Sequence, residues 1–459
     1  MNDFHALSAL EQARALRDGD VSSEALTRHY LSQIEAHNDA LGAFVSVQAR
    51  RAIRSARRAD RALRSASEGG PIFLGVPSGI KDLDPVRGTW TRMGSRAYRH
   101  LWAPVDGPVT RRVRAGGFVI IGKLATSEFA IMPVTETAIH PPCRNPWNRG
   151  HSAGGSSGGA ASAVAGGLLP IAQASDGAGS IRIPASFCHL VGFKPSRGVL
   201  PNFYKFFDPG GMTCVGSVSR TVEDTAAFFD VLVGRAYDPR TPPADSFLAA
   251  CAQPPGKLRI AFTTLSPLGE AEPHLCEAIR KAAEVLATMG HEVEERGAES
   301  GTVDEFIPIY AYMTSQIPVL RESYLQAPVR WLRSVGRTYR KAEIMAMVTS
   351  IAGRVERWFG DYDVWISPTS PVAPPRVGAW DNLSGEDAFR AAAMLGANTA
   401  VFNLSGQPAV SLPFGHTEEN LPIGVQLSAR RGQDRLLMAL AKQFETASPR
   451  PSAMKAPSA

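Results

Sequence analysis

A run of six small residues, GGSSGG at 154–159, lies inside the segment NRGHSAGGSSGGAASAVAGGLLPIAQASDGAGSIRIPASF and limits what this part of the chain can become. A flexible linker would continue as polar low-complexity sequence, whereas an Ala-rich apolar stretch suited to a buried helix follows here. Neither of the phosphate-cradling patterns GxxxxGK[ST] and GxGxxG is present. The run is therefore more consistent with a tightly packed chemical site than with a linker or a phosphate loop.

The run also matches the GxSxG pattern of the α/β-hydrolase nucleophile elbow, over residues 154–158. That elbow must follow a buried strand, but the preceding RNPWNRGHSA is polar and contains proline. It also requires a histidine further along the chain. His416, in the turn-like FGHTEEN, is the main late candidate, and a solvated loop histidine is its simpler interpretation. The elbow is thus a weak interpretation of this serine pair.

A second serine follows in SDGAGSIRIPAS, where small residues lead up to Ser180. Small residues allow consecutive backbone N–H groups to converge on one point, as an oxyanion hole requires. The plainer interpretation is a glycine-rich turn before a strand.

A base for these serines is available in GVPSGIKD, where Lys81 ends an apolar run. Burial lowers the pKa of a lysine and leaves a neutral amine able to take a proton. By itself, however, a lysine beside Asp82 is more often half of an ion pair.

Taken together, GVPSGIKD, GGSSGG and DGAGSIRIPA resemble the amidase signature family. The resemblance continues through GFKPSRG, SRTVEDTA, YDVWISPTSPVAPP, NLSGQPAVSLP and LPIGVQL, and covers about residues 5–446. It implies an α/β fold, with a single amidase signature domain over 1–446 in which helices surround a mixed, largely continuous central sheet. We expect 265–360 to be more helical and to shape the pocket, and 447–459 to be a disordered tail.

The resemblance also implies a Ser-cisSer-Lys triad that hydrolyses a carboxylic acid amide through an acyl-enzyme. Ser180 is the implied nucleophile, Ser156 after a cis peptide bond the relay, and Lys81 the neutral base. The implied oxyanion hole is formed by the N–H groups of Gly177, Ala178, Gly179 and Ser180, with Asp176 and Arg182 as a supporting pair. The family needs no metal and no organic cofactor.

One departure concerns Ala178, because many relatives have glycine there and a positive φ would strain an alanine. The sequence of this loop, with RNPW upstream, most resembles members of the family that hydrolyse linear or cyclic secondary amides, such as the 6-aminohexanoate cyclic dimer hydrolases.

Two alternative functions remain. One is the glutaminase A subunit of a tRNA-dependent amidotransferase, and the other is a binding protein built on an inactive amidase scaffold.

The net charge of +6 is concentrated in QARRAIRSARRADRALRS at 48–65, which has seven arginines and one aspartate. Its apolar residues recur at helical spacing, which predicts an amphipathic helix with a solvated basic face; a surface for RNA or an acidic partner is the alternative. We expect a small-molecule amide as substrate and no nucleic-acid or membrane partner, and a homodimer is compatible with the sequence.

The remaining expectations follow from composition and position. The opening residues are interrupted by charges and do not resemble a signal peptide, so we expect a cytoplasmic protein. The five cysteines are far apart and are predicted to be buried free thiols. Two mostly apolar segments, 128–142 and 306–324, are candidates for the pocket wall. His151 and His189 lie near the motifs but are expected to be structural.

Overall fold

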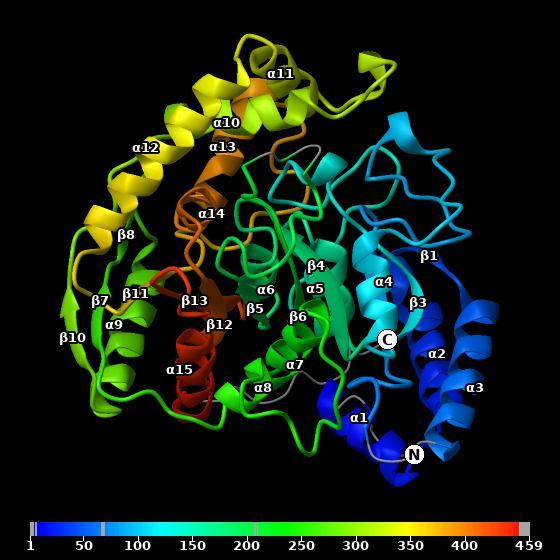
Figure 1. Cartoon of the computed structure of the whole chain (residues 1–459). Helices are drawn as coiled ribbons and strands as arrows, with labels where there is room; N and C mark the ends of the chain where they lie inside the picture. Colours follow the sequence, from blue (N-terminus) through cyan, green and yellow to red (C-terminus); the bar gives the residue numbers. More distant parts are fainter. Residues whose placement is uncertain (1–3, 5–6, 66–68, 206–207, 209, 449–459) are drawn as a thin grey trace.

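The computed structural model describes residues 4, 7–65, 69–205, 208 and 210–448 (Figure 1). The predicted tail lies outside the described residues except for 447 and 448. Helices and strands alternate along the chain, and the largest sheet is mixed and flanked by helices, which confirms the predicted α/β class.

The N-terminal part forms a three-stranded sheet with helices against it, at the right of Figure 1. Strand β3 lies in the centre, antiparallel to β1 and parallel to β2. The predicted basic helix is present as α3, which buries Ala52, Ala56 and Ala59 on one face. The elements are α1 (Ala9–Asp18), α2 (Ser23–Leu41), β1 (Phe44–Val47), α3 (Ala49–Ser65), β2 (Pro77–Lys81), η1 (Arg96–Tyr98), α4 (Pro108–Ala115), β3 (Val119–Leu124) and η2 (Glu128–Ala130).

The larger sheet has eight strands in the order β10-β7-β11-β13-β12-β5-β6-β4. The pairs β10/β7 and β7/β11 are parallel and the other pairs are antiparallel. Its strands are β4 (Ile171–Asp176), β5 (Val191–Lys194), β6 (Cys214–Ser219), β7 (Arg259–Phe262), β10 (Glu292–Glu295), β11 (Val364–Pro368), β12 (Ala409–His416) and β13 (Pro422–Ala429). A small hairpin joins β8 (Leu265–Ser266) to β9 (Gly269–Glu270).

Some of the remaining helices pack on this sheet, and α10, α11, α12 and α13 form a layer at one edge of the molecule. Helices α10, α11, α12 and α13 lie along the top and upper left of Figure 1; the first three belong to the interval 265–360. All helices that follow the N-terminal part are α5 (Gly158–Ala165), α6 (Arg182–Phe187), α7 (Val222–Leu232), α8 (Phe247–Ala250), α9 (Pro273–Thr288), α10 (Val303–Ser315), η3 (Glu322–Tyr324), α11 (Ala327–Gly336), α12 (Lys341–Phe359), α13 (Gly385–Ala393), η4 (Met394–Gly396), α14 (Ala400–Ser405) and α15 (Asp434–Ala447), within the described residues.

The central sheet is not as continuous as expected, because β2 and β4 face each other without a backbone ladder. Side chains join them instead. The amide oxygen of Gln173 on β4 accepts a hydrogen bond from the backbone N–H of Lys81 at 2.9 Å, and the Ser78 hydroxyl donates to the carbonyl of Ile171 at 3.0 Å. This seam between the two sheets brings the GVPSGIKD and SDGAGSIR segments together.

The GGSSGG run is packed too tightly to be a linker. A Cβ on Gly155 would lie 2.6 Å from the backbone nitrogen of Val134, and one on Gly159 would lie 2.3 Å from that of Ala125. Residues 158–164 of α5 are buried. The glycines therefore allow the run to pass against neighbouring backbone, and the Ala-rich stretch after it is the buried helix that its composition predicted.

All five cysteines are free, as predicted; four are buried and Cys214 is partly buried. Across the part of the chain that the structure describes, no helix combines the length and the apolar character needed to cross a membrane.

Candidate active site

Lys81, the last residue of β2, is completely buried among hydroxyl groups. Its Nζ donates hydrogen bonds to the hydroxyl oxygens of Ser156 at 2.7 Å, Ser157 at 2.8 Å and Ser175 at 3.1 Å. Burial lowers the pKa of Lys81 to about 7, although the charge of Asp84 acts in the opposite direction. A substantial fraction of Lys81 is therefore a neutral amine near pH 7, as a proton acceptor must be.

Asp82 does not pair with Lys81, contrary to the ion pair that adjacency alone would favour. Its carboxylate accepts a hydrogen bond from Lys123 Nζ on β3 at 2.7 Å, and both side chains are buried. The side chains of consecutive residues at the end of a strand are directed to different sides of the sheet. The carboxylate of Asp82 therefore binds Lys123, and the side chain of Lys81 faces the serines.

Ser156 is fully buried, and the peptide bond that joins it to Gly155 is cis, the geometry that the resemblance implied. Its carbonyl accepts a hydrogen bond from the Thr135 hydroxyl at 3.3 Å. Its hydroxyl lies against Lys81 Nζ. The relay serine predicted from the sequence is thus within proton-transfer distance of the predicted base.

Ser180 lies just before α6 and keeps 7% of its surface exposed, so it is the accessible member of the predicted triad. Its carbonyl accepts a hydrogen bond from the backbone N–H of Ser157 at 3.3 Å. The two serine segments are therefore joined directly by their backbones. The structure brings the predicted nucleophile, relay and base into one place.

The loop before Ser180 differs in detail from the predicted oxyanion hole. The N–H of Gly179 donates to a carboxylate oxygen of Asp176 at 2.6 Å, so this donor is already engaged. The remaining predicted donors are those of Gly177, Ala178 and Ser180. Ala178 has no positive φ, and the positive φ of this loop, 123°, falls on Gly179, which adopts it without strain. The alanine therefore replaces glycine at this position without backbone strain.

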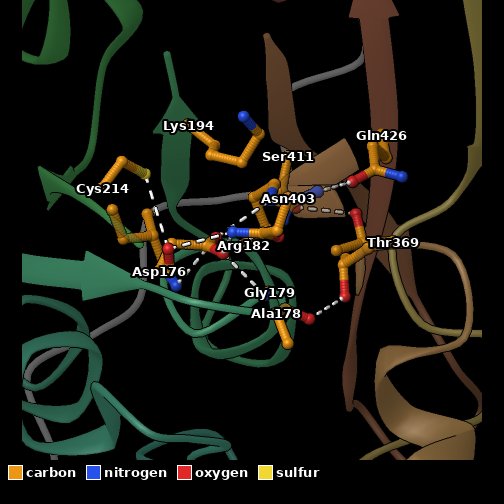
Figure 2. Close-up of polar contacts among 12 residues, drawn as sticks. Asp176, Ala178, Gly179, Arg182, Lys194, Cys214, Thr369, Asn403, Ser411 and Gln426 are labelled. Atoms are coloured by element: carbon orange, nitrogen blue, oxygen red, sulfur yellow. Dashed lines mark hydrogen bonds and ion pairs between the residues drawn. The ribbon is translucent and has the colours of Figure 1, made fainter. Parts of the chain in front are cut away.

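Asp176 and Arg182 form the buried pair that the resemblance implied (Figure 2). Arg182 Nε donates to Asp176 at 2.9 Å, and its other nitrogens reach Gln426 at 2.8 Å and Asn403 at 2.6 Å. Burial by itself would raise the pKa of Asp176, but Arg182 outweighs it and holds the pKa at about 2. A charged, fully bonded carboxylate thus anchors the loop that carries Ser180.

Comparison with known proteins agrees with this arrangement. The amidase family model matches residues 25–438. The chain belongs to the amidase signature family. Among curated relatives, it is 33% identical to a 6-aminohexanoate-cyclic-dimer hydrolase from Pseudomonas sp. (strain NK87), over 96% of this chain and 94% of that protein. The family consists of amidohydrolases, so this amidase is an enzyme that acts on carbon–nitrogen bonds.

Solved structures show the same likeness over the whole chain. A 6-aminohexanoate cyclic dimer hydrolase complexed with substrate has a TM-score of 0.85 and 30% identity, and covers 99% of this chain and 100% of its own. A bacterial aryl acylamidase has a TM-score of 0.84 and 25% identity, with 97% and 96% covered. The predicted family, fold class and enzyme class are confirmed.

Several residues of the amidase site were not assigned roles from the sequence. Asn403 and Gln426 bind Arg182, and the Thr399 hydroxyl donates to the carbonyl of Ala178 at 2.7 Å. Asn403 and Gln426 lie within NLSGQPAVSLP and LPIGVQL. The family motifs therefore included these residues, but they did not indicate that the residues bind Arg182. Thr399 lies outside these quoted motifs and becomes visible only through its contact.

Two mostly apolar cavities meet at the serines of the amidase. The first is lined by Ser180 and Ala178 together with side chains of α10, α12, α13 and α14. The second is lined by Ser156, Ser175 and Gly177, and by Met313, Thr314 and Ile317 from 306–324. Ile131 and Tyr310 line both cavities. Segments 128–142 and 306–324 therefore contribute walls, as expected, while α13 and α14 were missed.

Among the described residues, no histidine is hydrogen-bonded to the hydroxyl groups around Lys81. His416, expected in a solvated loop, ends β12 and is half-buried, with its ring 4.8 Å from that of His189 and 4.5 Å from that of Trp147. Both histidines have a pKa lowered by burial. His151 forms an isolated bridge with Arg376. The segment before Ser156 contains isolated bridges but no strand, so the context of a nucleophile elbow is missing.

Proposed function

We propose that this amidase hydrolyses a small-molecule carboxylic acid amide through an acyl-enzyme on Ser180, with Ser156 as relay and Lys81 as base. The observation that supports this most directly is the 2.7 Å hydrogen-bond distance between Lys81 Nζ and Ser156 Oγ, in a site that lowers the pKa of the lysine to about 7; the neutral amine accepts from the Ser156 hydroxyl across this distance. A buried lysine without a carboxylate partner can give up its proton near neutral pH.

In the proposed reaction, Ser180 Oγ attacks the amide carbon while its proton passes to Ser156, whose own proton passes to neutral Lys81. The negative charge on the carbonyl oxygen is held by the free N–H groups of the loop, each contributing about 2.7–4 kcal/mol to transition-state stabilisation. The ammonium of Lys81 then returns a proton through Ser156 to the leaving amine, and the C–N bond breaks. Water attacks the ester of Ser180 by the same route and releases the acid.

The two cavities support a substrate with a substituent on each side of the amide. The leaving amine takes its proton from the side of Ser156, which lines the second cavity. The acyl group then extends into the first cavity, along Ser180 and Phe306. Because both cavities have mostly apolar walls, we propose that N-substituted amides are better substrates than primary amides.

Fluorophosphonate labelling followed by mass spectrometry tests the nucleophile. We expect one adduct, located on Ser180, and no adduct in Ser180→Ala. An adduct on Ser156 with Ser180 unmodified would reverse the two roles, and a protein that takes up no label would favour a binding protein on an inactive scaffold.

A substrate panel tests the reaction class. The pure chain is assayed with primary, aryl, peptide C-terminal and cyclic amides and with glutamine. We expect turnover of at least one N-substituted amide without added protein. Activity that appears only with glutamine and a partner subunit would favour the glutaminase subunit of an amidotransferase instead.

A further inference from the structure

Asp84 is a buried carboxylate beside the base that the reaction outlined above leaves unused. It follows β2 by three residues, and its backbone N–H donates to the carbonyl of Lys81 at 3.1 Å. Only 3% of its surface is exposed. One carboxylate oxygen accepts hydrogen bonds from the Tyr204 hydroxyl at 3.0 Å and from the Gln173 side-chain amide at 3.2 Å. The side chain is therefore held in place from two directions.

Gln173 connects this carboxylate to the strand that carries the base. Its amide nitrogen donates to Asp84, and its amide oxygen accepts the backbone N–H of Lys81 at 2.9 Å. Tyr204 connects the same carboxylate to the second cavity, where it lines the wall with Ser156 and Ser175. Asp84 thus lies behind the catalytic groups, bonded to the cavity wall on one side and to the β2–β4 seam on the other.

The charges around this group are few. The charges of Lys81 and Lys123 act on Asp84 without a hydrogen bond to it, and Asp176 also acts on Lys81. Asp208 lines the same cavity as Tyr204. Burial raises the pKa of Asp84 to about 6, while the Tyr204 hydrogen bond and the two lysines oppose this rise. Near neutral pH the carboxylate is ionised, and its negative charge favours the ammonium form of Lys81.

We propose that Asp84 is a positioning residue for the base: held by Tyr204 and Gln173, its carboxylate favours the ammonium form of Lys81 and thereby sets the lowest pH at which this amidase turns over. This inference rests on the proposed function. The physical need is clear, because Lys81 must both accept a proton and return it to the amine. Burial alone would make the lysine too weak a base, and the nearby carboxylate restores part of its proton affinity.

The test is the pH profile of kcat/KM for Asp84→Asn, measured on the full chain with the best amide of the panel. Asparagine keeps the shape of the side chain and an oxygen that accepts from Tyr204 and Gln173, but removes the charge. We expect the acidic limb to move to lower pH by roughly 0.5–1 unit, less than the one to three units that an opposite charge in direct contact produces, because Asp84 acts on Lys81 without a hydrogen bond to it. Labelling of Ser180 by fluorophosphonate, measured over the same pH range, should move in parallel.

Asp208→Asn is the matched control, because Asp208 is also a buried carboxylate at the second cavity but accepts its hydrogen bond from the backbone N–H of Thr213. Its acidic limb should coincide with that of the wild type. Tyr204→Phe provides a second variant that keeps Asp84. Loss of the hydroxyl makes the carboxylate easier to protonate, so a smaller shift in the same direction is expected.

An Asp84→Asn profile that keeps the wild-type limb, or moves it to higher pH, overturns the proposal; a uniform loss at every pH would assign Asp84 a structural role only. Should Asp84→Asn not fold, the sign of the Tyr204→Phe shift decides. Failure of the proposed function has a different signature, since the wild type itself would then take up no label on Ser180.

Discussion

Two buried lysines, Lys81 and Lys123, lie on the neighbouring strands β2 and β3 and have opposite surroundings. Lys123, on β3, donates to the carboxylate of Asp82 at 2.7 Å. Lys81, at the end of β2, donates to three serine hydroxyls and to no carboxylate. Its pKa is lowered to about 7 because burial is not balanced by a directly bonded negative charge.

The comparison shows that burial alone does not make a lysine a base. Lys123 Nζ is hydrogen-bonded directly to a buried carboxylate, and breaking such a pair leaves an uncompensated buried charge. A buried amine among hydroxyls can exist in either form, and hydroxyls can pass the proton on. Lys123 therefore belongs to a structural pair, whereas the surroundings of Lys81 suit the role of base that we propose for it.

The largest effect is expected from Lys81→Ala. Without the proton acceptor, kcat/KM for the best amide should fall by about 10³-fold or more, since general acid–base catalysis contributes up to about 10⁴-fold. Ester hydrolysis should suffer less, because an alkoxide leaves with less help from a proton. Steady-state kinetics with circular dichroism as a folding check measures this. A variant close to wild type, together with an inactive His416→Ala, would transfer the role of base to a histidine.

Lys123→Met should affect stability instead of chemistry. It leaves Asp82 buried without its cation, and breaking a buried pair in this way costs about 3–5 kcal/mol in the free energy of unfolding. Urea unfolding measures the loss. Lys81→Met serves as the matched control and should lose clearly less, because Lys81 is hydrogen-bonded to serine hydroxyls and no carboxylate loses a direct partner. Equal losses for the two variants would remove the distinction between the two lysines.

The pH dependence of the wild type tests the proposed role of Lys81 without mutation. Since Lys81 must be neutral and its pKa is about 7, kcat/KM should rise through pH 7 and fall about tenfold for each unit below it. The native pKa lies below that of the unfolded chain, so folding releases protons from Lys81 between about pH 7 and 10, and its contribution to stability increases with pH over that window. An acidic limb near pH 4 would contradict a lysine base.

The smallest effect is expected from Ser157→Ala. Ser157 accepts from Lys81 at 2.8 Å and donates to the carbonyl of Ser175 at 3.1 Å, so it orients the amine without being on the proposed proton path. Loss of one such hydrogen bond is worth roughly tenfold in rate. Ser156→Ala should be more damaging, with a water able to bridge part of the gap. If Ser157→Ala were the more damaging of the two, the relay would have to be reassigned.

Much of the site was predictable because its residues lie in short, contiguous motifs. Ser180 and its loop, the GGSSGG run and Lys81 could each be recognised from local sequence, and the family resemblance supplied their roles. Thr399, Asn403 and Gln426 could not be assigned in this way. Each acts through a contact more than 200 residues away along the chain, and local patterns carry no information on such pairs.

The sequence by itself indicated the fold class, the family and the segments that carry Lys81, Ser156 and Ser180, because these segments are short contiguous motifs that resemble the family whatever their surroundings in space. Only the tertiary structure decided the partners of the charged groups. Adjacency in the sequence favoured an ion pair between Lys81 and Asp82, yet Asp82 binds Lys123. The N–H of Gly179 already donates to Asp176, which leaves three of the four expected oxyanion donors. The physical reason is that the proton affinity and partner of a buried group depend on the nearest charges in space, and these come from strands that only folding brings together.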